Sequence, residues 1–372
     1  MMKNGRPRVI IGGGGTGGHV FPAISIANAI KKRWYDAEIL FVGAQDRMEM
    51  ERVPAAGYRI VGLPVSGFDR KHLLKNIVVA IKLLKSMYMA NKIIADFKPD
   101  VVVGVGGYAS GPILRTAASK GIPTLIQEQN SYPGVTNKML ADKAVKICVA
   151  YEGLEKYFPK EKIVITGNPC RQDLTVSEEN RKKGIEFFRL DPERKTILLI
   201  GGSLGAKTLN ESVVSAFPKI ERADDVQVIW QCGKYYYGNI KQLQAEGKIP
   251  SNIRLYDFIS QMDYAYSVAD LIISRAGAGS ISEFCLLGKP VILVPSPNVA
   301  EDHQTKNAQA LAEKDAAIMI ADSDAPSFLF DMALEVVRDE ERLKSLSNNI
   351  AKFAQPYSAD RIVDEIEKII GK

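Results

Sequence analysis

The sequence has few cysteines and histidines, and it contains no long apolar run. Its 372 residues include three histidines and four cysteines, and no two cysteines form a Cys-x-x-Cys pair or a metal-ligand spacing. We therefore expect reduced, mostly buried thiols. No segment approaches the roughly 20 apolar residues that span a bilayer, and the short run Val9–Ile11 falls well below the apolar core of a signal peptide. These absences favour a cytoplasmic protein.

The charge is distributed unevenly along the chain. Up to Gly167 there are 24 Lys and Arg against 13 Asp and Glu, a net charge of +11, whereas from Asn168 onward 25 oppose 30, a net charge of −5. This asymmetry suggests that the first half meets something anionic, such as a membrane surface, a phosphorylated substrate or nucleic acid. An accident of surface composition would produce the same counts.

Short apolar strands alternate with helical stretches through most of the chain. Such strands, separated by helices, indicate parallel sheets that are covered on both faces. The strands that we expect are 8–11, 38–42, 58–63, 100–105, 123–127, 145–150, 163–166, 196–200, 226–231, 253–256, 271–274, 291–294 and 317–320. The length suits two domains, which we place at 1–167 and 168–350. The amphipathic segment 351–372 is expected to pack back onto the first domain.

Both halves begin with the same pattern of a strand followed by glycines. Val9–Ile11 runs into Gly12–Gly15, and Leu198–Ile200 runs into Gly201–Gly202, which is a weak internal repeat. Ligands of doubly wound sheets bind outside the carboxyl ends of the strands. We therefore predict an α/β protein with two doubly wound, Rossmann-like parallel-sheet domains that face a cleft.

The glycine run 12–18, followed by His19, joins the first strand to a helix. Glycines let the backbone approach a ligand, and the helix N-terminus favours negative charge. A dinucleotide fingerprint can be aligned on this run, but the second strand ends in Gly43-Ala44 and lacks the acidic residue that holds a ribose. His19 is a candidate general base, since histidine titrates near neutral pH; a capping or packed histidine is the alternative.

Two further strand ends in the first half carry candidate residues. The glycines of 104–112 clear space, and Ser110 or the following helix is suited to a second anionic group. Gln127–Asn130 places four polar residues at the end of a strand that is otherwise apolar, which favours a role in a site. Glu128 is the alternative candidate for the base.

The second half contains a similar set. Gly201–Ala206 repeats the anion-binding design, and Arg275–Glu283 links a strand to a helix through a glycine-rich turn. Glu283 is suited to ribose hydroxyls, although a glutamate near a helix start is often purely structural. Residues 302–308 offer amide and imidazole groups for sugar hydroxyls. Asp322–Asp324 resembles a metal-type Asp-x-Asp but more readily caps the next helix; we expect no bound metal and no cofactor.

Taken together, these residues resemble the MurG family, the N-acetylglucosaminyltransferases of peptidoglycan precursor synthesis. The matching blocks follow the family order over nearly the whole chain. They are the Gly-Gly-Thr-Gly-Gly-His run ending at His19, the Gly-Gly-Tyr-Ala-Ser-Gly-Pro run ending at Pro112, and the segments 128–130, 167–171, 201–206, 275–283 and 304–308.

The resemblance implies a GT-B type fold and an inverting transfer without a required metal. N-acetylglucosamine would pass from UDP-GlcNAc to the C4 hydroxyl of lipid I, forming lipid II at the cytoplasmic face of the bacterial inner membrane. Peripheral membrane association, no nucleic acid, and contacts with cell-wall synthesis and division proteins are expected. The implied donor contacts are Thr16, Gly17, Gly18, Asn130, Arg171, Ser203, Ile259, Ala278, Gly279, Ser280, Ile281, Ser282, Glu283 and Gln304.

Within that set, Ile259 would face uracil, Glu283 the ribose and Gln304 the sugar. His19 and the loop of Gly106, Gly107, Tyr108 and Ser110 would face the acceptor. The alternatives are a UDP-GlcNAc 2-epimerase or another UDP-sugar transferase of the same fold, a nicotinamide-dependent oxidoreductase, and a non-catalytic sugar-nucleotide sensor. The oxidoreductase would need the missing ribose carboxylate.

A lysine-bearing helix is expected over 71–97. At about 100° per residue, its lysines share one side, with Val78 and Met89 among them, and we predict that this side docks on anionic lipid. The docking lysines would be Lys71, Lys75, Lys82, Lys85 and Lys92. The opposite side is predicted to pack on the sheet and consists of Leu73, Ile77, Ala80, Leu84, Met87 and Tyr88. A merely solvated lysine face is the alternative.

Overall fold

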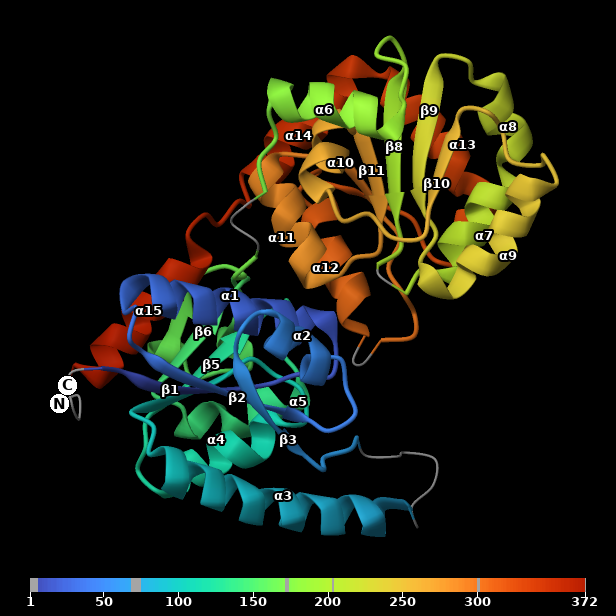
Figure 1. Ribbon diagram of the computed structural model, residues 1–372. Coiled ribbons are helices and arrows are strands. Elements are labelled where there is room, and N and C mark those ends of the chain that lie inside the picture. The colour runs from blue at the N-terminus through green and yellow to red at the C-terminus, as the bar shows by residue number, and fades with distance from the viewer. Residues whose placement is uncertain (1–5, 68–74, 171–173, 203, 300–301, 372) are drawn as a thin grey trace. The chain divides into compact units, whose positions relative to one another are not determined.

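The structure is a computed structural model that describes residues 6–67, 75–170, 174–202, 204–299 and 302–371, with the backbone alone at 75 and 76. The chain forms two compact units. Unit 1 is Met1–Arg171 with Gln355–Lys372, and unit 2 is Gln172–Ala354. Each unit contains one parallel sheet with helices on both faces (Figure 1).

The sheet of unit 1 has seven strands in the order β3-β2-β1-β4-β5-β6-β7, and every neighbouring pair is parallel. The order reverses between β1 and β4, so the loops that follow these two strands border the point where doubly wound sheets bind ligands. The strands are β1 (Arg8–Gly12), β2 (Glu38–Ala44), β3 (Arg59–Leu63), β4 (Val101–Gly104), β5 (Thr124–Glu128), β6 (Lys146–Val149) and β7 (Ile163–Ile165).

Helices cover both faces of this sheet. The core on one face includes side chains of α1 and α15, and the core on the other includes side chains of α3, α4 and α5; Figure 1 shows these two layers. The helices of unit 1 are α1 (Gly17–Arg33), α2 (Glu49–Ala55), α3 (Lys75–Phe97), α4 (Ser110–Ser119), α5 (Val135–Leu140) and α15 (Ser358–Ile370). Three short 3-10 turns are η1 (Ala141–Lys143), η2 (Leu154–Lys156) and η3 (Lys160–Lys162).

Helix α15 belongs to unit 1 although it follows all of unit 2 in the sequence. Its apolar side chains, among them Ile362, Val363 and Ile366, are buried in the same core as α1. At its surface, Arg33 of α1 pairs with Asp364 at 2.7 Å. A surface ion pair contributes little, about 0–1 kcal/mol, whereas each buried branched side chain contributes about 1.5–3 kcal/mol. Apolar burial therefore holds α15 in place.

Unit 2 repeats the same strand order with six strands, β10-β9-β8-β11-β12-β13, so its reversal lies between β8 and β11. The strands are β8 (Lys195–Ile200), β9 (Val226–Gln231), β10 (Ile253–Tyr256), β11 (Leu271–Ser274), β12 (Val291–Leu293) and β13 (Ile318–Met319). The helices are α6 (Glu178–Phe188), α7 (Lys207–Ser215), α8 (Phe217–Arg222), α9 (Lys234–Ala245), α10 (Met262–Val268), α11 (Ala278–Leu287), α12 (His303–Ala312), α13 (Ala325–Arg338) and α14 (Glu340–Ala351).

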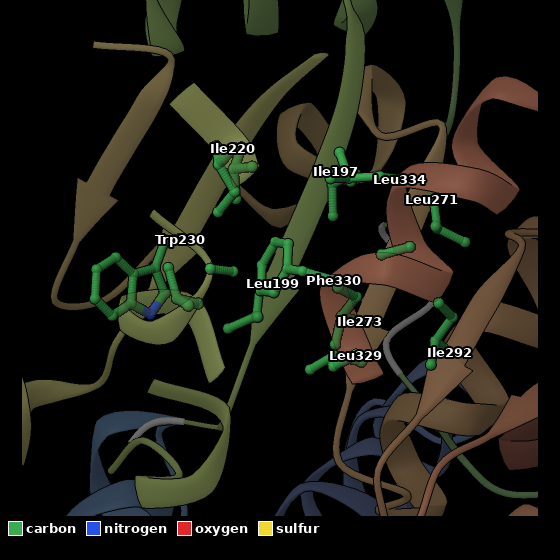
Figure 2. Close-up of a cluster of buried hydrophobic side chains, with 14 of the residues drawn as sticks. Ile197, Leu199, Ile220, Trp230, Leu271, Ile273, Ile292, Leu329, Phe330 and Leu334 are labelled. Carbon is green, nitrogen blue, oxygen red and sulfur yellow. The ribbon is translucent and has the colours of Figure 1, made fainter. Parts of the chain in front are cut away.

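Two apolar cores enclose this second sheet. One contains Trp230 and Leu199 from the strands together with Leu329 and Phe330 of α13 (Figure 2). The other, on the opposite face, includes side chains of α6, α10, α11 and α12. Successive strand residues alternate between these cores, so a strand buried on both faces is apolar throughout.

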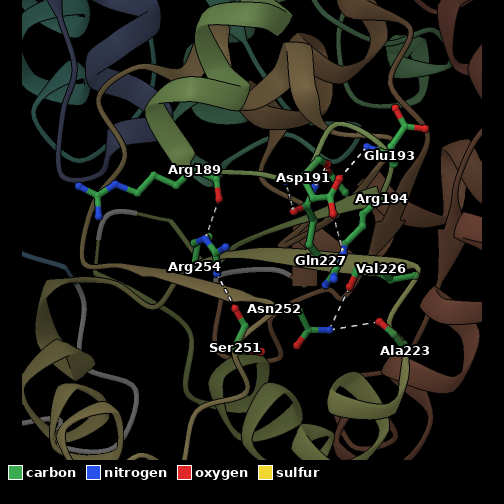
Figure 3. A network of polar contacts seen from close by, with 11 residues as sticks. Arg189, Asp191, Glu193, Arg194, Ala223, Val226, Gln227, Ser251, Asn252 and Arg254 are labelled. Atoms are coloured by element: carbon green, nitrogen blue, oxygen red, sulfur yellow. Dashed lines mark hydrogen bonds and ion pairs between the residues drawn. The ribbon is translucent and has the colours of Figure 1, made fainter.

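Polar side chains tie together the amino ends of the strands in unit 2 (Figure 3). The Gln227 amide accepts from the Asp191 N–H at 3.0 Å and donates to the Asp191 carbonyl at 2.8 Å. The Asn252 amide donates to the carbonyls of Ala223 and Val226. These groups hold the sheet at the end away from the glycine turns, so the scaffold polar contacts and the candidate site occupy opposite edges.

The predicted fold class is confirmed, and every predicted strand has an observed counterpart within two residues at either end. The predicted packing side of the helix at 71–97 is wrong. The side chains of Ile77, Leu84 and Tyr88 are 60%, 71% and 73% exposed. Among the described side chains of α3, the buried ones are instead Ser86, Ala90 and Ile94, on the opposite side. Because this helix has apolar residues on more than one side, its pattern indicates a helix but does not show which side packs on the sheet.

Residues 71–74, which include Lys71, lie outside the described residues. Among the predicted docking lysines, Lys82, Lys85 and Lys92 are exposed. No helix in the described ranges is long and apolar enough to cross a membrane.

Candidate active site

The glycine loop after β1 turns tightly before α1 begins. The Gly13 N–H donates to the Val42 carbonyl of β2 at 3.0 Å, so the loop starts as an extension of the sheet. Gly14 and Gly15 both have positive φ, +149° and +94°, which favours glycine at these positions. The first turn of α1 then contains Gly17, Gly18 and His19. The loop therefore places His19 at the carboxyl edge of the sheet.

The imidazole of His19 is held through its Nδ1 atom. Nδ1 lies 3.2 Å from the Gly14 carbonyl oxygen and 3.3 Å from the Thr16 hydroxyl. A carbonyl can only accept, so Nδ1 carries the hydrogen and Nε2 is the basic nitrogen of the neutral ring. This tautomer suits a general base whose Nε2 faces the next loop.

That next loop follows β4 and lies directly against His19. A Cβ on Gly106 would stand 2.8 Å from His19 Nε2, and a Cβ on Gly107 would stand 2.3 Å from the Gly14 carbonyl oxygen. Both glycines also have positive φ, +92° and +82°. Only residues without a side chain allow this approach. The structure thus brings His19 together with Gly106 and Gly107.

The rest of this loop divides into an exposed and a buried part. Tyr108 is exposed, whereas Ser110 is buried and its hydroxyl donates to the Gly107 carbonyl at 2.8 Å. Ser110 therefore stabilises the loop from its buried side, whereas the Tyr108 side chain is exposed to solvent.

Glu128 ends β5 inside a ring of donors and is only 1% exposed. Its Oε1 accepts from the backbone and side-chain amides of Asn130, at 3.0 and 3.2 Å. Its Oε2 accepts from the Gly134 N–H at 3.1 Å and from Asn137 Nδ2 at 2.8 Å. Burial raises the pKa of Glu128, while the hydrogen bonds from Asn130, Asn137 and Gly134 act in the opposite direction. This carboxylate organises the segment 130–137.

Asn137 of α5 was not among the predicted site residues. Its Nδ2 donates to the Glu128 carboxylate and to the Gln127 carbonyl, which fixes the amide orientation. Its Oδ1 is buried and has no hydrogen-bond partner within the described residues. A Cβ on Gly106 would lie 3.8 Å from Asn137 Nδ2, so His19 and Asn137 border the same glycine. No motif marked this asparagine, because it lies inside a short helix.

The polar residues around Glu128 join three segments. Gln129 Nε2 donates to the Val105 carbonyl after β4 at 2.8 Å, and Asn168 Nδ2 donates to the Gln129 carbonyl at 3.0 Å. Both side chains are buried. They fix the ends of neighbouring strands, so the predicted polar group at 127–130 serves the scaffold as well as the site.

Glu49 is a second residue that sequence reasoning missed. It lies in the first turn of α2 and is buried, with Oε2 accepting from the Gly15 N–H and Oε1 from the Ala44 N–H, both at 2.9 Å. A Cβ on Gly14 would lie 2.1 Å from its Oε1. A protein carboxylate therefore takes up the Gly15 N–H, a loop donor of the kind that binds phosphate in dinucleotide domains. This arrangement argues against a dinucleotide site in unit 1.

In unit 2 the turn after β8 closes on itself. The Gly205 N–H donates to the Gly202 carbonyl at 3.1 Å, and both glycines have positive φ. Gln231, at the end of β9, donates to the Gly202 carbonyl at 3.1 Å and accepts from the Ile259 N–H at 2.9 Å. Gln231 thus links the glycine turn to the buried Ile259, and sequence reasoning did not single it out. Ser203 lies outside the described residues, as does Arg171.

The turn after β11 leads into α11, whose N-terminus lies at the carboxyl edge of the unit 2 sheet. Residues 278–283 form its first turns. The Ser282 hydroxyl donates to the Ala278 carbonyl at 2.9 Å, and the Glu283 Oε2 accepts from the Tyr266 hydroxyl at 2.7 Å. A helix N-terminus beside a glycine turn at the strand-order reversal favours an anionic ligand.

Arg275 connects this turn to the segment after β12, and Gln304 of α12 contacts the same segment. Gln304 Oε1 accepts from the Ser296 N–H at 2.9 Å, so its amide nitrogen is directed away from that backbone. Arg275 donates to the carbonyls of Val294 and Pro295, at 3.1 and 3.2 Å, and pairs with Asp322. These contacts fix the edge of the site around α11 and α12.

The interpretation of Asp322–Asp324 as a helix cap is confirmed in position, because Asp324 is the N-cap residue of α13. Asp322 pairs with Arg275 and accepts from the Thr208 hydroxyl at 2.9 Å. Asp324 stands at the N-cap of α13 but accepts from the Ser323 hydroxyl, with no side-chain cap hydrogen bond in the described structure. Across the described ranges, no three His, Cys, Asp or Glu side chains gather in a way that would hold a metal.

Known proteins resemble the chain over nearly its full length. Residues 9–149 match the glycosyltransferase family 28 N-terminal domain and residues 196–362 its C-terminal domain. A relative from Parabacteroides distasonis, a UDP-N-acetylglucosamine--N-acetylmuramyl-(pentapeptide) pyrophosphoryl-undecaprenol N-acetylglucosamine transferase, is 66% identical over 366 residues, with 98% of this chain and 99% of the relative covered. A crystal structure of Acinetobacter baumannii MurG has 29% identity and a TM-score of 0.76, covering 97% of this chain and 99% of that one. The chain belongs to the MurG family.

Structural likeness extends beyond this family. A UDP-GlcNAc 2-epimerase from Neisseria meningitidis matches with a TM-score of 0.68 and 15% identity, over 98% of this chain and 100% of that chain. At such low identity the likeness shows the fold alone. The family assignment therefore rests on the MurG relatives and the family 28 domains.

The contacts of Glu49 give a stability prediction. Glu49→Gln should place an amide N–H₂ against a backbone N–H, because both carboxylate oxygens accept from the backbone. A buried, unpaired donor costs about 1–3 kcal/mol, which should lower the midpoint of thermal unfolding by roughly 2–10 °C. The amide of Gly15 should also exchange its hydrogen faster, as measured by mass spectrometry.

Glu51→Gln is the matched control, because Glu51 lies on the same helix and is exposed. Equal melting and equal exchange in both variants would mean that Glu49 does not hold the glycine loop.

Proposed function

We propose that this chain transfers N-acetylglucosamine from UDP-GlcNAc to the C4 hydroxyl of the N-acetylmuramoyl-pentapeptide of lipid I, forming lipid II with inversion. The observation that carries the proposal is the setting of His19, whose Nδ1 is fixed by the Gly14 carbonyl and whose Nε2 lies beside the Gly106 loop. The named activity of the Parabacteroides relative supports the choice of donor and acceptor.

The reaction is a single displacement. His19 Nε2 accepts the proton of the C4 hydroxyl as its oxygen attacks the anomeric carbon of the donor sugar. The bond between that carbon and the β-phosphate oxygen breaks, and UDP leaves with the electron pair. The N-terminus of α11 and its glycine turn would stabilise the charge on the leaving diphosphate.

In unit 2, the donor would lie along the turns after β8 and β11. Glu283 would accept from the ribose hydroxyls, and the outward amide of Gln304 would donate to the sugar. Because the Ile259 N–H already donates to Gln231, its carbonyl oxygen would accept from the uracil ring. Ala278–Ser282 would line the diphosphate, and Arg171 and Ser203 are assigned to the donor from their motifs.

In unit 1, Thr16–Gly18 and Asn130 would also contact the sugar-nucleotide donor. Gly106–Tyr108 would contact the acceptor, and Ser110 would support this loop. Glu128 would not act as the base, because four hydrogen-bond donors already surround its carboxylate. It would act by holding Asn130 and Asn137, and the buried Oδ1 of Asn137 would accept from an acceptor hydroxyl.

The exposed part of α3 supports peripheral docking on the cytoplasmic face of the inner membrane. Ile81, Leu84 and Tyr88 are exposed on the same helix as Lys82 and Lys85. Apolar side chains beside basic ones suit an anionic lipid surface. The acceptor is itself lipid-anchored, so docking would keep the enzyme at its substrate. Contacts with cell-wall synthesis and division proteins stay a prediction.

Incubation with UDP-GlcNAc and a short-chain lipid I analogue tests the proposed activity. UDP should be released only when the acceptor is present, together with a disaccharide product of inverted linkage. Formation of UDP-ManNAc without acceptor would instead identify an epimerase, and binding of UDP-GlcNAc without turnover of either kind would identify a sensor.

His19→Ala should lower turnover by roughly 10²–10⁴, the usual contribution of a general base. UDP-GlcNAc affinity, measured by calorimetry, should barely change. Near-normal turnover would leave His19 as a structural residue and return the role of base to another group.

Glu283→Gln should weaken UDP binding at least tenfold, because hydrogen bonds to a charged group are worth about 1.5–3 kcal/mol each. Calorimetry with UDP alone measures the effect. Glu335→Gln, an exposed glutamate of α13 in the same unit, is the control. Equal affinity in wild type and Glu283→Gln would reduce Glu283 to a structural role at the start of α11.

The α3 surface gives a prediction with two separable parts. Reversing Lys82 and Lys85 to Glu should weaken binding to phosphatidylglycerol vesicles at least tenfold at low salt, since each lysine contributes about 1 kcal/mol. Replacing Ile81 and Leu84 by Ser should weaken binding at high salt as well, because apolar contact is not screened. Sedimentation with vesicles measures both effects.

Lys241→Glu with Lys344→Glu is the matched control, because both lysines are exposed in unit 2. Activity on a detergent-soluble acceptor should survive in all these variants. Unchanged sedimentation in both α3 variants would exclude this surface.

A further inference from the structure

Tyr266 is a buried tyrosine of α10 whose hydroxyl reaches the candidate donor site. The residue is 1% exposed, and its ring packs edge-on against Phe284 of α11, with centroids 6.0 Å apart and an interplanar angle of 89°. Both rings lie in the core that includes side chains of α6, α10, α11 and α12. Close packing leaves such a ring little freedom, so the hydroxyl is a donor at a fixed position.

That hydroxyl donates to Glu283 Oε2 at 2.7 Å. A hydrogen bond to a carboxylate is short and about twice as strong as a neutral one. Glu283 is only partly buried, and a glutamate side chain on a helix has several rotamers, whose number a hydrogen bond reduces. The bond to the rigid Tyr266 ring therefore restricts the rotamers of the glutamate side chain.

We infer that Tyr266 is a positioning residue for the nucleotide ribose, orienting the Glu283 carboxylate toward the 2′ and 3′ hydroxyls. The inference rests on the proposed contact between Glu283 and the ribose. A carboxylate has about four acceptor sites, so one bond to Tyr266 is compatible with a pair of bonds to a vicinal diol. Fixing the carboxylate before binding lowers the entropic cost of that pair.

This role also has a consequence for ligand choice. A nucleotide without the two hydroxyls would make neither of these bonds to the oriented carboxylate, which penalises deoxyribose ligands. Tyr266 would thus contribute to discrimination between ribose and deoxyribose without touching the nucleotide. The competing explanation is that a buried tyrosine hydroxyl needs a partner, and that Glu283 supplies one for stability alone.

Calorimetry with UDP and with 2′,3′-dideoxy-UDP separates the two explanations. Tyr266→Phe keeps the ring in the core and removes only the hydroxyl. It should weaken UDP binding about three- to tenfold, the loss expected for one hydrogen bond, and leave dideoxy-UDP binding unchanged. Tyr266→Phe combined with Glu283→Gln should bind UDP no more weakly than Glu283→Gln alone, because the tyrosine acts through the carboxylate.

Tyr264→Phe is the matched control, since Tyr264 lies on the same helix and packs against Phe187 of α6 instead. It should bind both ligands as wild type does. Thermal unfolding of each variant checks that the core is intact.

Two outcomes would overturn the inference. One is unchanged UDP affinity in Tyr266→Phe while Glu283→Gln binds weakly; the other is an equal loss for UDP and dideoxy-UDP. Unchanged UDP affinity in Glu283→Gln would instead remove the proposed ribose contact itself, which distinguishes failure of the proposed function from failure of the role of Tyr266.

Discussion

The contact between the two glycine loops of unit 1 is the constraint on which its candidate site depends. Gly107 approaches the Gly14 carbonyl so closely that a Cβ on Gly107 would overlap it. A Cβ on Gly106 would likewise overlap the imidazole of His19. That carbonyl in turn fixes the imidazole through Nδ1. The geometry of the candidate base therefore follows from two backbones in contact, and a methyl group at either position would separate them. Backbone contact of this kind is less adaptable than side-chain packing, since neither loop can choose another rotamer.

Two buried carboxylates support the candidate site of unit 1. Glu49 holds the first glycine loop through two backbone amides, and Glu128 holds the segment 130–137 through four donors. In unit 2 the roles are reversed, because the carboxylate of Glu283 is the group that is held and Tyr266 is the support. In each case a rigid element restrains a flexible one, which reduces the reorganisation needed when a ligand binds.

The strands and the strand-end loops could be predicted from sequence because apolar runs and glycine clusters are local signals. Two of the residues that were missed act over long separations: Glu49 bonds to Gly15 across 34 positions, and Gln231 connects Gly202 with Ile259. Such partners have no local signature. The prediction of the packing side of α3 was wrong for a related reason. A helix with more than one apolar side does not show in its sequence which side meets the sheet.

The position of α15 has a consequence for the order in which the protein is made. The ribosome completes all of unit 2 before it reaches the residues that cover the apolar face beside α1. The first unit therefore lacks α15 while more than 180 further residues are synthesised, and during that time part of its apolar core is exposed to solvent. Translation that stops within the second unit leaves the first one unfinished too. A single late helix thus couples the maturation of the two units and makes a truncated product a substrate for chaperones and proteases.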